Sequence, residues 1–353
     1  MSSSAWQIQA AEPTDWRSVD VVENLFLNES IPIPSAQDLL PKTALVRIRA
    51  VAINARDVMV IAHDPLYPIL NKENLIPCAD GVGEISAVGQ DSIWKVGDRV
   101  MIHPVGWTYE QELPDLIAIE GKGAGDIDGT LRQFTVLEDS HLLAAPETLT
   151  FEQAASIPCC GATAINALFC GPVSLSPNMT ILTQGTGGVS CFCIQIASYF
   201  GCTVISTSSS DAKLVTAKRL GATHTVNYTT HPDWDEEVLR LTNGKGVDHV
   251  LEIGGGGTIE KSIKCLRHGG LVSLIGFLAG SKKVDLTSAI LFGGKTLRGV
   301  FGFNKIHVER LINFVDMFEL KPEVAKVFEW KDAKEAFKES MVKEIVGKIV
   351  IKV

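Results

Sequence analysis

Long hydrophobic runs are missing from this chain of 353 residues. A membrane-spanning helix needs roughly 18–20 consecutive apolar residues, and the longest apolar run, Leu271 to Gly280, is about half that length. The first residues, MSSSAWQIQAAEPTDW, have neither the basic start nor the apolar stretch of a secretory leader. We therefore expect no membrane partner and a cytoplasmic location.

Basic residues and closely spaced cysteines are also scarce. The chain has 32 Lys and Arg against 41 Asp and Glu, a formal net charge of −9. An acidic surface repels phosphate backbones, which argues against nucleic acid as a general partner. The eight cysteines include no CxxC pair, so reduced thiols are expected rather than a disulfide framework or a structural zinc cluster.

The first part of the chain is predicted to be β-rich. Residues 45–53 (LVRIRAVAI) alternate apolar and basic side chains, as a half-buried strand does. Residues 81–89 and 95–102 are expected to form further short strands between Gly and Asp turns. Several short strands with glycine turns predict a small barrel.

From residue 151 onward the pattern changes to alternating strands and helices. Residues 151–170 are expected to be helical, and the chain ends with a helix at 331–344 and a strand at 347–353. In between, the expected strands are 180–183, 202–207, 247–253 and 271–277, and the expected helices are 189–200 and 212–220. Such alternation predicts βαβ units and a parallel sheet.

A glycine-rich loop, QGTGGVS at 184–190, follows the first of these strands and opens a helix. Gly185, Gly187 and Ser190 occupy the three positions of the G-x-G-x-x-G dinucleotide fingerprint, with Ser in place of the third Gly. The helix N-terminus beyond them offers free N–H groups and a positive dipole end to a phosphate. The predicted cofactor-binding residues here are Gly185, Thr186, Gly187, Gly188 and Val189.

The tip of the second strand indicates which dinucleotide binds. An NAD site usually has Asp or Glu there to hold the ribose 2′-OH, but this chain has Ser208 and Ser209, with Asp211 too late. Hydroxyls with a nearby Lys213 suit a 2′-phosphate, which favours NADP(H) over NAD(H). Lys218 is predicted to assist, although a solvated helix face is the usual location of Lys.

Further cofactor contacts are expected at the ends of other strands. Tyr228 follows the third strand and is predicted to flank the adenosine, with a core or surface tyrosine as the alternative. Gly254 and Gly255 follow one strand, and Gly276 and Phe277 follow the next. Doubly wound sheets bind ligands at the carboxyl ends of their strands, so these four residues are expected near the nicotinamide.

Taken together, these segments resemble the medium-chain dehydrogenase/reductase superfamily, in its zinc-free, quinone-oxidoreductase-like and zinc-type alcohol dehydrogenase-like branch. The resemblance runs over nearly the whole chain, and no single motif carries it. Its pieces are VAINARD (51–57), IPCADGVGEISAVG (76–89), KVGDRV (95–100), AASIPCCGATAINAL (154–168), QGTGGVS (184–190), AKRLGATHTVNY (217–228), GVDHVLEIGG (246–255) and GKIVIKV (347–353).

The resemblance implies an α/β protein in which a Rossmann domain is inserted into a GroES-like β-barrel catalytic domain. We expect the catalytic domain at 1–160 and 301–353 and the NADP(H)-binding Rossmann domain at 161–300. Homodimers that pair Rossmann sheet edges are frequent in this family, so a homodimer is also expected.

The zinc ligands of the family can be compared position by position. Zinc-containing members have Cys where this chain has Asn54, and a His-Glu pair where it has Ala79 and Asp80. Only Cys159 matches the third ligand, whereas catalytic zinc needs three protein ligands. The segment 103–129, where relatives bind a structural zinc, contains no Cys. The prediction is therefore no zinc.

Candidate catalytic residues come from the same resemblance. Asn54 matches a position with a side-chain amide near the nicotinamide and the substrate, with a turn asparagine as the alternative. Tyr67 is the predicted proton donor, although it lies about two residues later than the tyrosine of related enoyl reductases. His63 is the rival acid, because the pKa range of histidine suits proton transfer.

The remaining candidates are predicted to line the pockets. Thr163 matches a position that packs against the nicotinamide, and Phe301 and Phe303 are predicted to line the opposite wall. Trp107 and Tyr109 begin the most individual segment of the chain, running to Ile127, which is a candidate substrate lid or an exposed insertion.

The predicted function is hydride transfer from NADPH to an activated double bond, as in an α,β-unsaturated carbonyl, or to a small-molecule quinone. Conjugation spreads the incoming charge to an oxygen that hydrogen bonds can stabilise without zinc. Two alternatives remain: a zinc-free carbonyl reductase or alcohol dehydrogenase, and an NADPH-binding protein without catalysis.

Overall fold

The chain folds into two compact units. The computed structural model describes residues 2–353 apart from 110–111, 117–118, 120, 281 and 343. Unit 1 comprises Met1–Cys160 and Phe303–Val353, and unit 2 comprises Gly161–Gly302. The second boundary thus lies two residues later than the 300/301 boundary expected from the sequence.

Unit 1 is built on a sheet around a long strand, β3, in which all pairs are antiparallel except the parallel pair β14–β15. Its strands run in the order β14-β15-β3-β4-β5-β7, with β6 also paired to β3, and β1 pairs with β2 in a separate hairpin. The strands are β1 (Ser2–Ile8), β2 (Leu25–Pro32), β3 (Thr43–Ala52), β4 (Asp80–Val88), β5 (Arg99–Ile102), β6 (Phe134–Glu138), β7 (Leu142–Ala144), β14 (Val324–Glu329) and β15 (Lys348–Lys352). The helices are α1 (Ala55–Ile61), α2 (Phe151–Ala155), α9 (Lys305–Phe318) and α10 (Ala333–Ser340).

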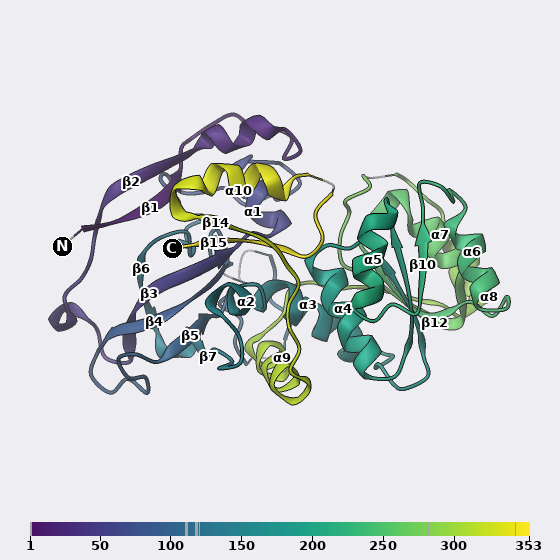
Figure 1. Ribbon diagram of the computed structural model, residues 1–353. Helices are drawn as coiled ribbons and strands as arrows, with labels where there is room; N and C mark the ends of the chain where they lie inside the picture. The colour runs from purple at the N-terminus through teal and green to yellow at the C-terminus, as the bar shows by residue number, and fades with distance from the viewer. Residues whose placement is uncertain (1, 110–111, 117–118, 120, 281, 343) are drawn as a thin grey trace. The chain divides into compact units, whose positions relative to one another are not determined.

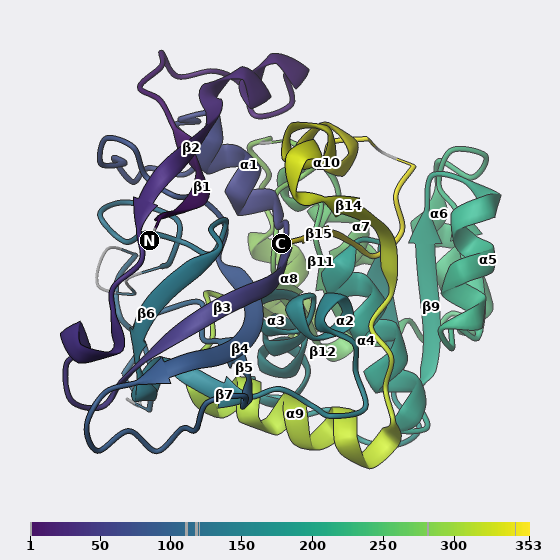
Figure 2. The same cartoon turned by 60° about the vertical axis from the view of Figure 1, so that its left-hand side comes forward.

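The sequence of β3 explains its central place. Its apolar residues are buried, while Arg47 is exposed and Arg49 reaches Glu84 of β4 at 3.0 Å. The first half of β3 pairs with β6 and its last three residues pair with β15, while β4 runs along the other edge. This arrangement joins the beginning and the end of the chain in one sheet (Figure 2).

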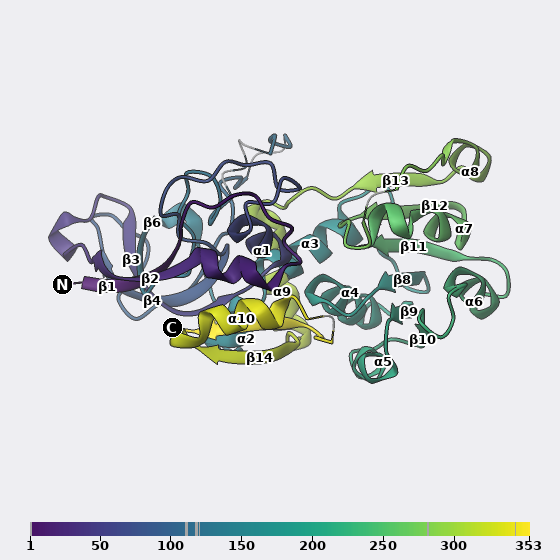
Figure 3. The ribbon, with the colours of Figure 1, turned by 90° about the horizontal axis from the view of Figure 1, so that it is seen from above.

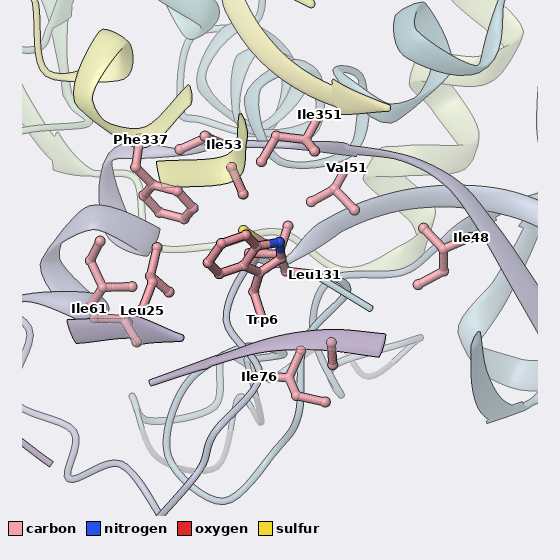
Figure 4. Close-up of a cluster of buried hydrophobic side chains, with 14 of the residues drawn as sticks. Trp6, Leu25, Ile48, Val51, Ile53, Ile61, Ile76, Leu131, Phe337 and Ile351 are labelled. Carbon is pink, nitrogen blue, oxygen red and sulfur yellow. The ribbon is translucent and has the colours of Figure 1, made fainter. Parts of the chain in front are cut away.

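The core of unit 1 forms around Trp6. Figure 4 shows the Trp6 ring among large apolar side chains from β2, β3, α1 and α10, including Phe337. Burying each of these side chains contributes roughly 1.5–3 kcal/mol. Because Phe337 lies in α10 and Trp6 in β1, the core also fastens the C-terminal segment to the N-terminal one.

Unit 2 is a six-stranded parallel sheet with strand order β10-β9-β8-β11-β12-β13. The chain starts in the middle at β8, moves outward to β10, then crosses to β11 and moves outward the other way. The strands are β8 (Thr180–Gln184), β9 (Thr203–Ser208), β10 (His224–Asn227), β11 (Val247–Glu252), β12 (Leu266–Leu274) and β13 (Thr296–Gly299). This is the order of a doubly wound sheet, which binds ligands where the direction of winding reverses, here at β8 and β11.

Helices cover both faces of this sheet. α4 and α5 contact β8, β9 and β10 on one face, whereas α6, α7 and α8 pack with one another on the other (Figures 1 and 3). The helices are α3 (Pro158–Phe169), which begins in unit 1, α4 (Gly188–Tyr199), α5 (Asp211–Arg219), α6 (Trp234–Leu241), α7 (Ile259–Lys264) and α8 (Thr287–Gly293). In the described residues, no helix combines the length and apolar character that a membrane crossing requires.

Two expected strands have different bounds. Residues 95–98 form a turn rather than strand, closed by the Lys95 N–H donating to Asp98 at 2.7 Å, so β5 begins only at Arg99. β12 starts at Leu266 and ends at Leu274, which leaves Gly276 and Phe277 in the following loop. Short 3-10 turns complete the structure at Val19–Asn24, Ala36–Asp38, Asp139–His141, Gly255–Gly257 and Trp330–Asp332.

Candidate active site and cofactor-binding loop

The glycine-rich loop joins β8 to α4, as the sequence predicts. Gly185 has a positive φ of 69°, which favours glycine. Within the described residues, no atom outside the immediate neighbours lies within 4 Å of where a Cβ at Gly185 or Gly187 would be. Gly187 is the N-cap of α4, so the free N–H groups of a twelve-residue helix begin at this open loop. The loop therefore has the space and the donors that a pyrophosphate needs.

Two buried side chains that the sequence analysis did not single out hold this loop in place. The Gln184 Oε1 atom accepts from the N–H groups of Ile253 and Gly254, and its Nε2 donates to Glu252 at 2.7 Å. Glu252 is 0% exposed and also accepts from the N–H groups of Gly254 and Gly255. The loop after β8 is thus fastened to the loop after β11. The sequence did contain a signal for this pair, because Gln184 and Glu252 are polar residues at the ends of two buried strands, β8 and β11.

The tip of β9 has the polar character expected from the sequence. The Lys213 ammonium donates to Ser209 Oγ at 2.6 Å, and Ser208 Oγ lies 3.4 Å from Thr186 Oγ1 of the glycine-rich loop. The first acidic residue, Asp211, accepts from Asn227 at 2.9 Å. The structure therefore brings together Thr186 of the glycine-rich loop and Ser208, Ser209 and Lys213 at the tip of β9.

The two other candidates near this tip differ in position. Tyr228 is 43% exposed, and its N–H donates to the Ser208 carbonyl at 3.0 Å, which puts it beside the tip. Lys218 is exposed on α5. Since it follows Lys213 by five residues, it lies on a different face of the helix. The group of Ser209 and Lys213 does not include it.

The glycines after β11 and β12 pack against each other. A Cβ at Gly255, which has a φ of +76°, would lie 2.8 Å from the Phe277 Cα, and a Cβ at Gly276 would lie 2.8 Å from the Ile253 carbonyl oxygen. Close backbone approach therefore requires both glycines. Phe277 is 42% exposed at the carboxyl edge of the sheet.

In unit 1, three strands bring a polar cluster to one edge of the sheet. β3 runs antiparallel to β4 and β15, so its last residue, Ala52, pairs with Asp80 at the start of β4 and with Val350 in β15. Asn54 follows directly as the N-cap of α1, and Lys348 is the first residue of β15. All three side chains are buried, with exposures of 7% for Asn54, 0% for Asp80 and 3% for Lys348.

Hydrogen bonds and charge connect this cluster. The Lys348 ammonium donates to Asn54 Oδ1 at 2.5 Å and to the Ile53 carbonyl at 2.8 Å, and lies 3.6 Å from the Asp80 carboxylate. Asn54 Nδ2 donates to Asp80 at 3.0 Å. Burial raises the pKa of Asp80 to about 6, against the opposing effect of Lys348. Burial alone would lower the pKa of Lys348, but Cys160 and Asp80 raise it overall.

A second chain of contacts leads from Asn54 to Tyr67. The Asp57 carboxylate accepts from the Asn54 N–H at 2.8 Å and pairs with the Arg56 guanidinium at 3.3 Å. Arg56 in turn donates to the Tyr67 hydroxyl from Nε at 3.2 Å and from Nη2 at 2.9 Å. Because Arg56 supplies only donors, the Tyr67 oxygen is the acceptor and its own O–H remains available. The structure thus links two of the three catalytic candidates.

The third catalytic candidate, His63, lies apart from this network. It follows α1 with a φ of +50°, and its Nε2 contacts the Gln9 carbonyl at 3.2 Å. Trp107 is only 8% exposed and packs edge-on against His307. Tyr109 is 51% exposed and donates to Glu309 of α9 at 2.7 Å. The segment they open includes residues outside the described part, so the lid remains an expectation.

The three wall candidates are divided between the units. Phe303 is 4% exposed and packs edge-on against His103, so it belongs to the interior of unit 1. Thr163, in α3, and Phe301 are half-buried and belong to unit 2.

Comparisons with known proteins identify the family. Residues 40–147 match the alcohol dehydrogenase GroES-like domain, and residues 188–318 match the zinc-binding dehydrogenase domain. The zinc-type alcohol dehydrogenase-like protein C1773.06c of Schizosaccharomyces pombe (strain 972 / ATCC 24843) is 36% identical over 323 residues, covering 90% of this chain and 92% of its own length. The chain belongs to the medium-chain dehydrogenase/reductase superfamily. It is therefore an oxidoreductase, as predicted.

Solved structures of other members of the superfamily confirm the α/β fold class. A proposed alcohol dehydrogenase from Sinorhizobium meliloti 1021 has a TM-score of 0.88 and 31% identity, covering 100% of this chain and 99% of its own. An NAD-dependent alcohol dehydrogenase has a TM-score of 0.87 and 30% identity, covering 99% of each chain. The resemblance inferred from the sequence is thus confirmed.

The zinc site of this superfamily can be tested on the side chains at its ligand positions. Asn54 supplies an amide, Ala79 supplies no ligand atom, and burial raises the pKa of Cys159 well above its usual range. The Lys348 ammonium adds a positive charge among them. Across the described residues, no three His, Cys, Asp or Glu side chains gather in a way that could hold a metal. These residues do not fit a catalytic zinc ion, which needs three protein ligands.

Proposed function

We propose that this protein is a zinc-independent, NADPH-dependent reductase of activated double bonds, as in α,β-unsaturated carbonyls, or of quinones. The observation that carries the proposal is the buried Lys348–Asn54–Asp80 cluster. Two of its members, Asn54 and Asp80, stand where zinc-containing relatives have a Cys and the Glu of a His-Glu pair. A neutral amide held by an ammonium and a carboxylate provides a hydrogen-bond donor but no Lewis acid. Hydride transfer to an isolated ketone is helped most by a Lewis acid that polarises the carbonyl oxygen. In an enone or quinone, hydrogen bonds alone can stabilise the negative charge that develops on the oxygen.

The preference for NADPH rests on the tip of β9. Ser208, Ser209 and Lys213 offer two hydroxyls and an ammonium, the groups that suit a phosphate. The first acidic residue, Asp211, pairs with Asn227. An NAD site would instead have a carboxylate at this tip for the ribose 2′-OH. NADPH would supply the hydride, and the glycine-rich loop and the N-terminus of α4 would bind its pyrophosphate.

The residues of unit 1 would handle the substrate. Hydride added to the β-carbon of an enone leaves negative charge on its carbonyl oxygen, which an Asn54 N–H stabilises. A proton must then reach the α-carbon. The Tyr67 O–H can donate it, because both hydrogen bonds from Arg56 go to the tyrosine oxygen. Water then returns a proton to Tyr67, so that one NADPH and one proton reduce one double bond.

The names of similar proteins favour a second candidate function. Both solved structures described above carry the name alcohol dehydrogenase, and one of them is NAD-dependent. A zinc-free carbonyl reductase or alcohol dehydrogenase would transfer hydride to the carbonyl carbon instead. The two candidates differ in product, which is a saturated ketone for the first and an allylic alcohol for the second.

Metal analysis together with product analysis tests the proposal. The purified protein is analysed for bound zinc, treated with a chelator, and incubated with NADPH and a panel of enones, quinones and simple ketones. We expect less than stoichiometric zinc, turnover that survives the chelator, and saturated ketone or hydroquinone as the product. Stoichiometric zinc, or allylic alcohol as the main product, would overturn it. NADPH binding without any turnover would favour a non-catalytic role.

A further inference from the structure

Asn54 has one side-chain N–H left over within the buried cluster. Its Oδ1 accepts from the Lys348 ammonium and from the Cys160 thiol, the latter at 3.5 Å. Its Nδ2 carries two N–H groups, and among the described residues only Asp80 accepts from it. The side chain is 7% exposed, so it keeps a small accessible surface. One donor of Asn54 is therefore available to a ligand.

The polarity of the neighbours permits only one orientation of this amide. If the amide were flipped, its N–H groups would face the Lys348 ammonium and its oxygen would face the Asp80 carboxylate, so both contacts would become repulsive. Buried polar groups that lose their partners cost about 1–3 kcal/mol each, and more when charged. Lys348 and Asp80 together therefore hold the free N–H on a fixed side.

Lys348 itself has no donor left for a substrate. Its three N–H groups face the Ile53 carbonyl, Asn54 Oδ1 and the Asp80 carboxylate. Asp80 is held in turn by the N–H of Cys159 at 3.0 Å, in the first turn of α3. A lysine in this state acts through Asn54 and not on the reacting atoms.

We propose that Lys348 and Asp80 are positioning residues that orient the Asn54 amide, so that its free N–H donates to the substrate carbonyl oxygen. This inference rests on the proposed reductase function. Lys348 is then a buried cation that contacts Asn54 and Asp80, and it affects the substrate only through the neutral Asn54 amide. The inference also gives a reason for the three residue types. The Asn54 amide is held in one orientation only if a donor, Lys348, faces its oxygen and an acceptor, Asp80, faces its nitrogen.

A double-mutant cycle tests the inference. Kinetic constants on the best enone substrate are measured for Lys348→Met, Asn54→Ala and the double variant, with Lys352→Met, on the exposed end of β15, as the matched control. Removing one donor to a developing oxyanion costs about 100-fold or more in kcat, so we expect this loss for Asn54→Ala. We expect about a 10-fold or larger loss for Lys348→Met, and no further loss when it is added to Asn54→Ala.

The conservative variant and NADPH affinity separate positioning from folding. Lys348→Arg should recover part of kcat, and the Kd for NADPH should stay near wild type in both variants. The melting temperature of Lys348→Met should fall, because the buried Asp80 carboxylate loses its partner. If Lys348→Met does not fold, Asp80→Asn replaces it in the same cycle, with the same expectation. If Lys348→Met lowers kcat by the same factor in wild type and in Asn54→Ala, the inference is overturned, because the lysine then acts independently of the amide.

A measurement without turnover distinguishes this inference from the proposed function. The side-chain amide signal of Asn54 is identified in ¹⁵N-asparagine-labelled protein by its absence in Asn54→Ala. We expect slow hydrogen exchange for it in wild type and faster exchange in Lys348→Met. Unchanged exchange would overturn the inference even if the enzyme reduces enones. Slow exchange in a protein that reduces neither enones nor quinones would overturn the proposed function alone.

Discussion

At the scale of the residue, the proposed chemistry depends on two polar groups held by charged neighbours. Asn54 is fixed by Lys348 and Asp80, and Tyr67 is fixed by Arg56. Resemblance to the family pointed to Asn54 and Tyr67 from the sequence. It did not point to Lys348, because that residue lies 294 positions away from Asn54 and meets it only through strand pairing.

The proton-donor role of Tyr67 gives the first prediction. Tyr67→Phe keeps the ring over which the Arg56 guanidinium lies, 5.2 Å from its centroid, but removes the O–H. General acid catalysis contributes about 100-fold or more, so kcat on an enone should fall by that order. The Kd for NADPH should stay unchanged, as measured by fluorescence titration. An unchanged kcat would exclude Tyr67 as the donor and leave His63 as the candidate.

The cofactor preference gives a second prediction at this scale. Ser209→Asp combined with Lys213→Ala puts a carboxylate in place of the hydroxyl and ammonium at the tip of β9. The affinity for NADPH should fall about 10-fold or more, because each charge-assisted hydrogen bond contributes roughly 1.5–3 kcal/mol. The affinity for NADH should change much less.

The control for this pair is Lys245→Ala, since Lys245 is an exposed lysine elsewhere in unit 2. It should leave both affinities unchanged in calorimetric titrations. Equal weakening of NADPH and NADH binding by the double variant would contradict a 2′-phosphate site at Ser209 and Lys213.

At the scale of the element, strand ends determine where chemistry can occur. The end of β3 meets the starts of β4 and β15, which gathers Asn54, Asp80 and Lys348, and the ends of β8 and β11 meet at Gln184 and Glu252. Hydrophobic alternation predicted most of these strands. It did not predict the turn at 95–98, where the Asp98 carboxylate replaces strand pairing.

A buried histidine within β11 gives a prediction on stability and pH. Burial lowers the pKa of His249 from about 6.5 to about 4, with the charge of Arg298 adding to the shift. Between these two values the unfolded chain binds a proton that the folded chain does not bind. Stability should therefore fall as the pH falls through this window, by about 2 kcal/mol between pH 7 and pH 5 for this residue alone.

His249→Gln should make this loss of stability smaller. The comparison is made by urea unfolding at pH 7 and pH 5 for wild type, His249→Gln and His268→Gln. His268 is exposed and serves as the control. If wild type and His249→Gln lose the same free energy of unfolding between the two pH values, the burial of His249 does not contribute to acid sensitivity.

At the scale of the whole molecule, the residues of the proposed function are divided between the two units. Unit 2 provides the dinucleotide loop and unit 1 provides the amide, the tyrosine and their charged supports. The change from short glycine-bounded strands to βαβ alternation predicted a β-rich part and a parallel-sheet part, and the family resemblance implied that the second is inserted into the first. The sequence could not predict the polar networks, since Glu252 and Lys348 acquire their roles from neighbours that only the folded chain brings together.

Two expectations on assembly and location stay predictions. Where the structure describes unit 2, β10 and β13 are the two outer strands of the sheet, and we expect a second copy to pair with one of these edges in the homodimer. Light scattering of the purified protein would measure the mass in solution. All eight cysteines are free thiols in the structure.

In the proposed reaction, hydride goes to an activated carbon–carbon double bond without zinc. Its most direct test uses NADPH carrying deuterium at C4, an α,β-unsaturated ketone and protein treated with a chelator, with the product analysed by mass spectrometry and NMR. We expect a saturated ketone with deuterium on the β-carbon. An allylic alcohol with deuterium on the carbinol carbon, formed only when zinc is restored, would contradict it.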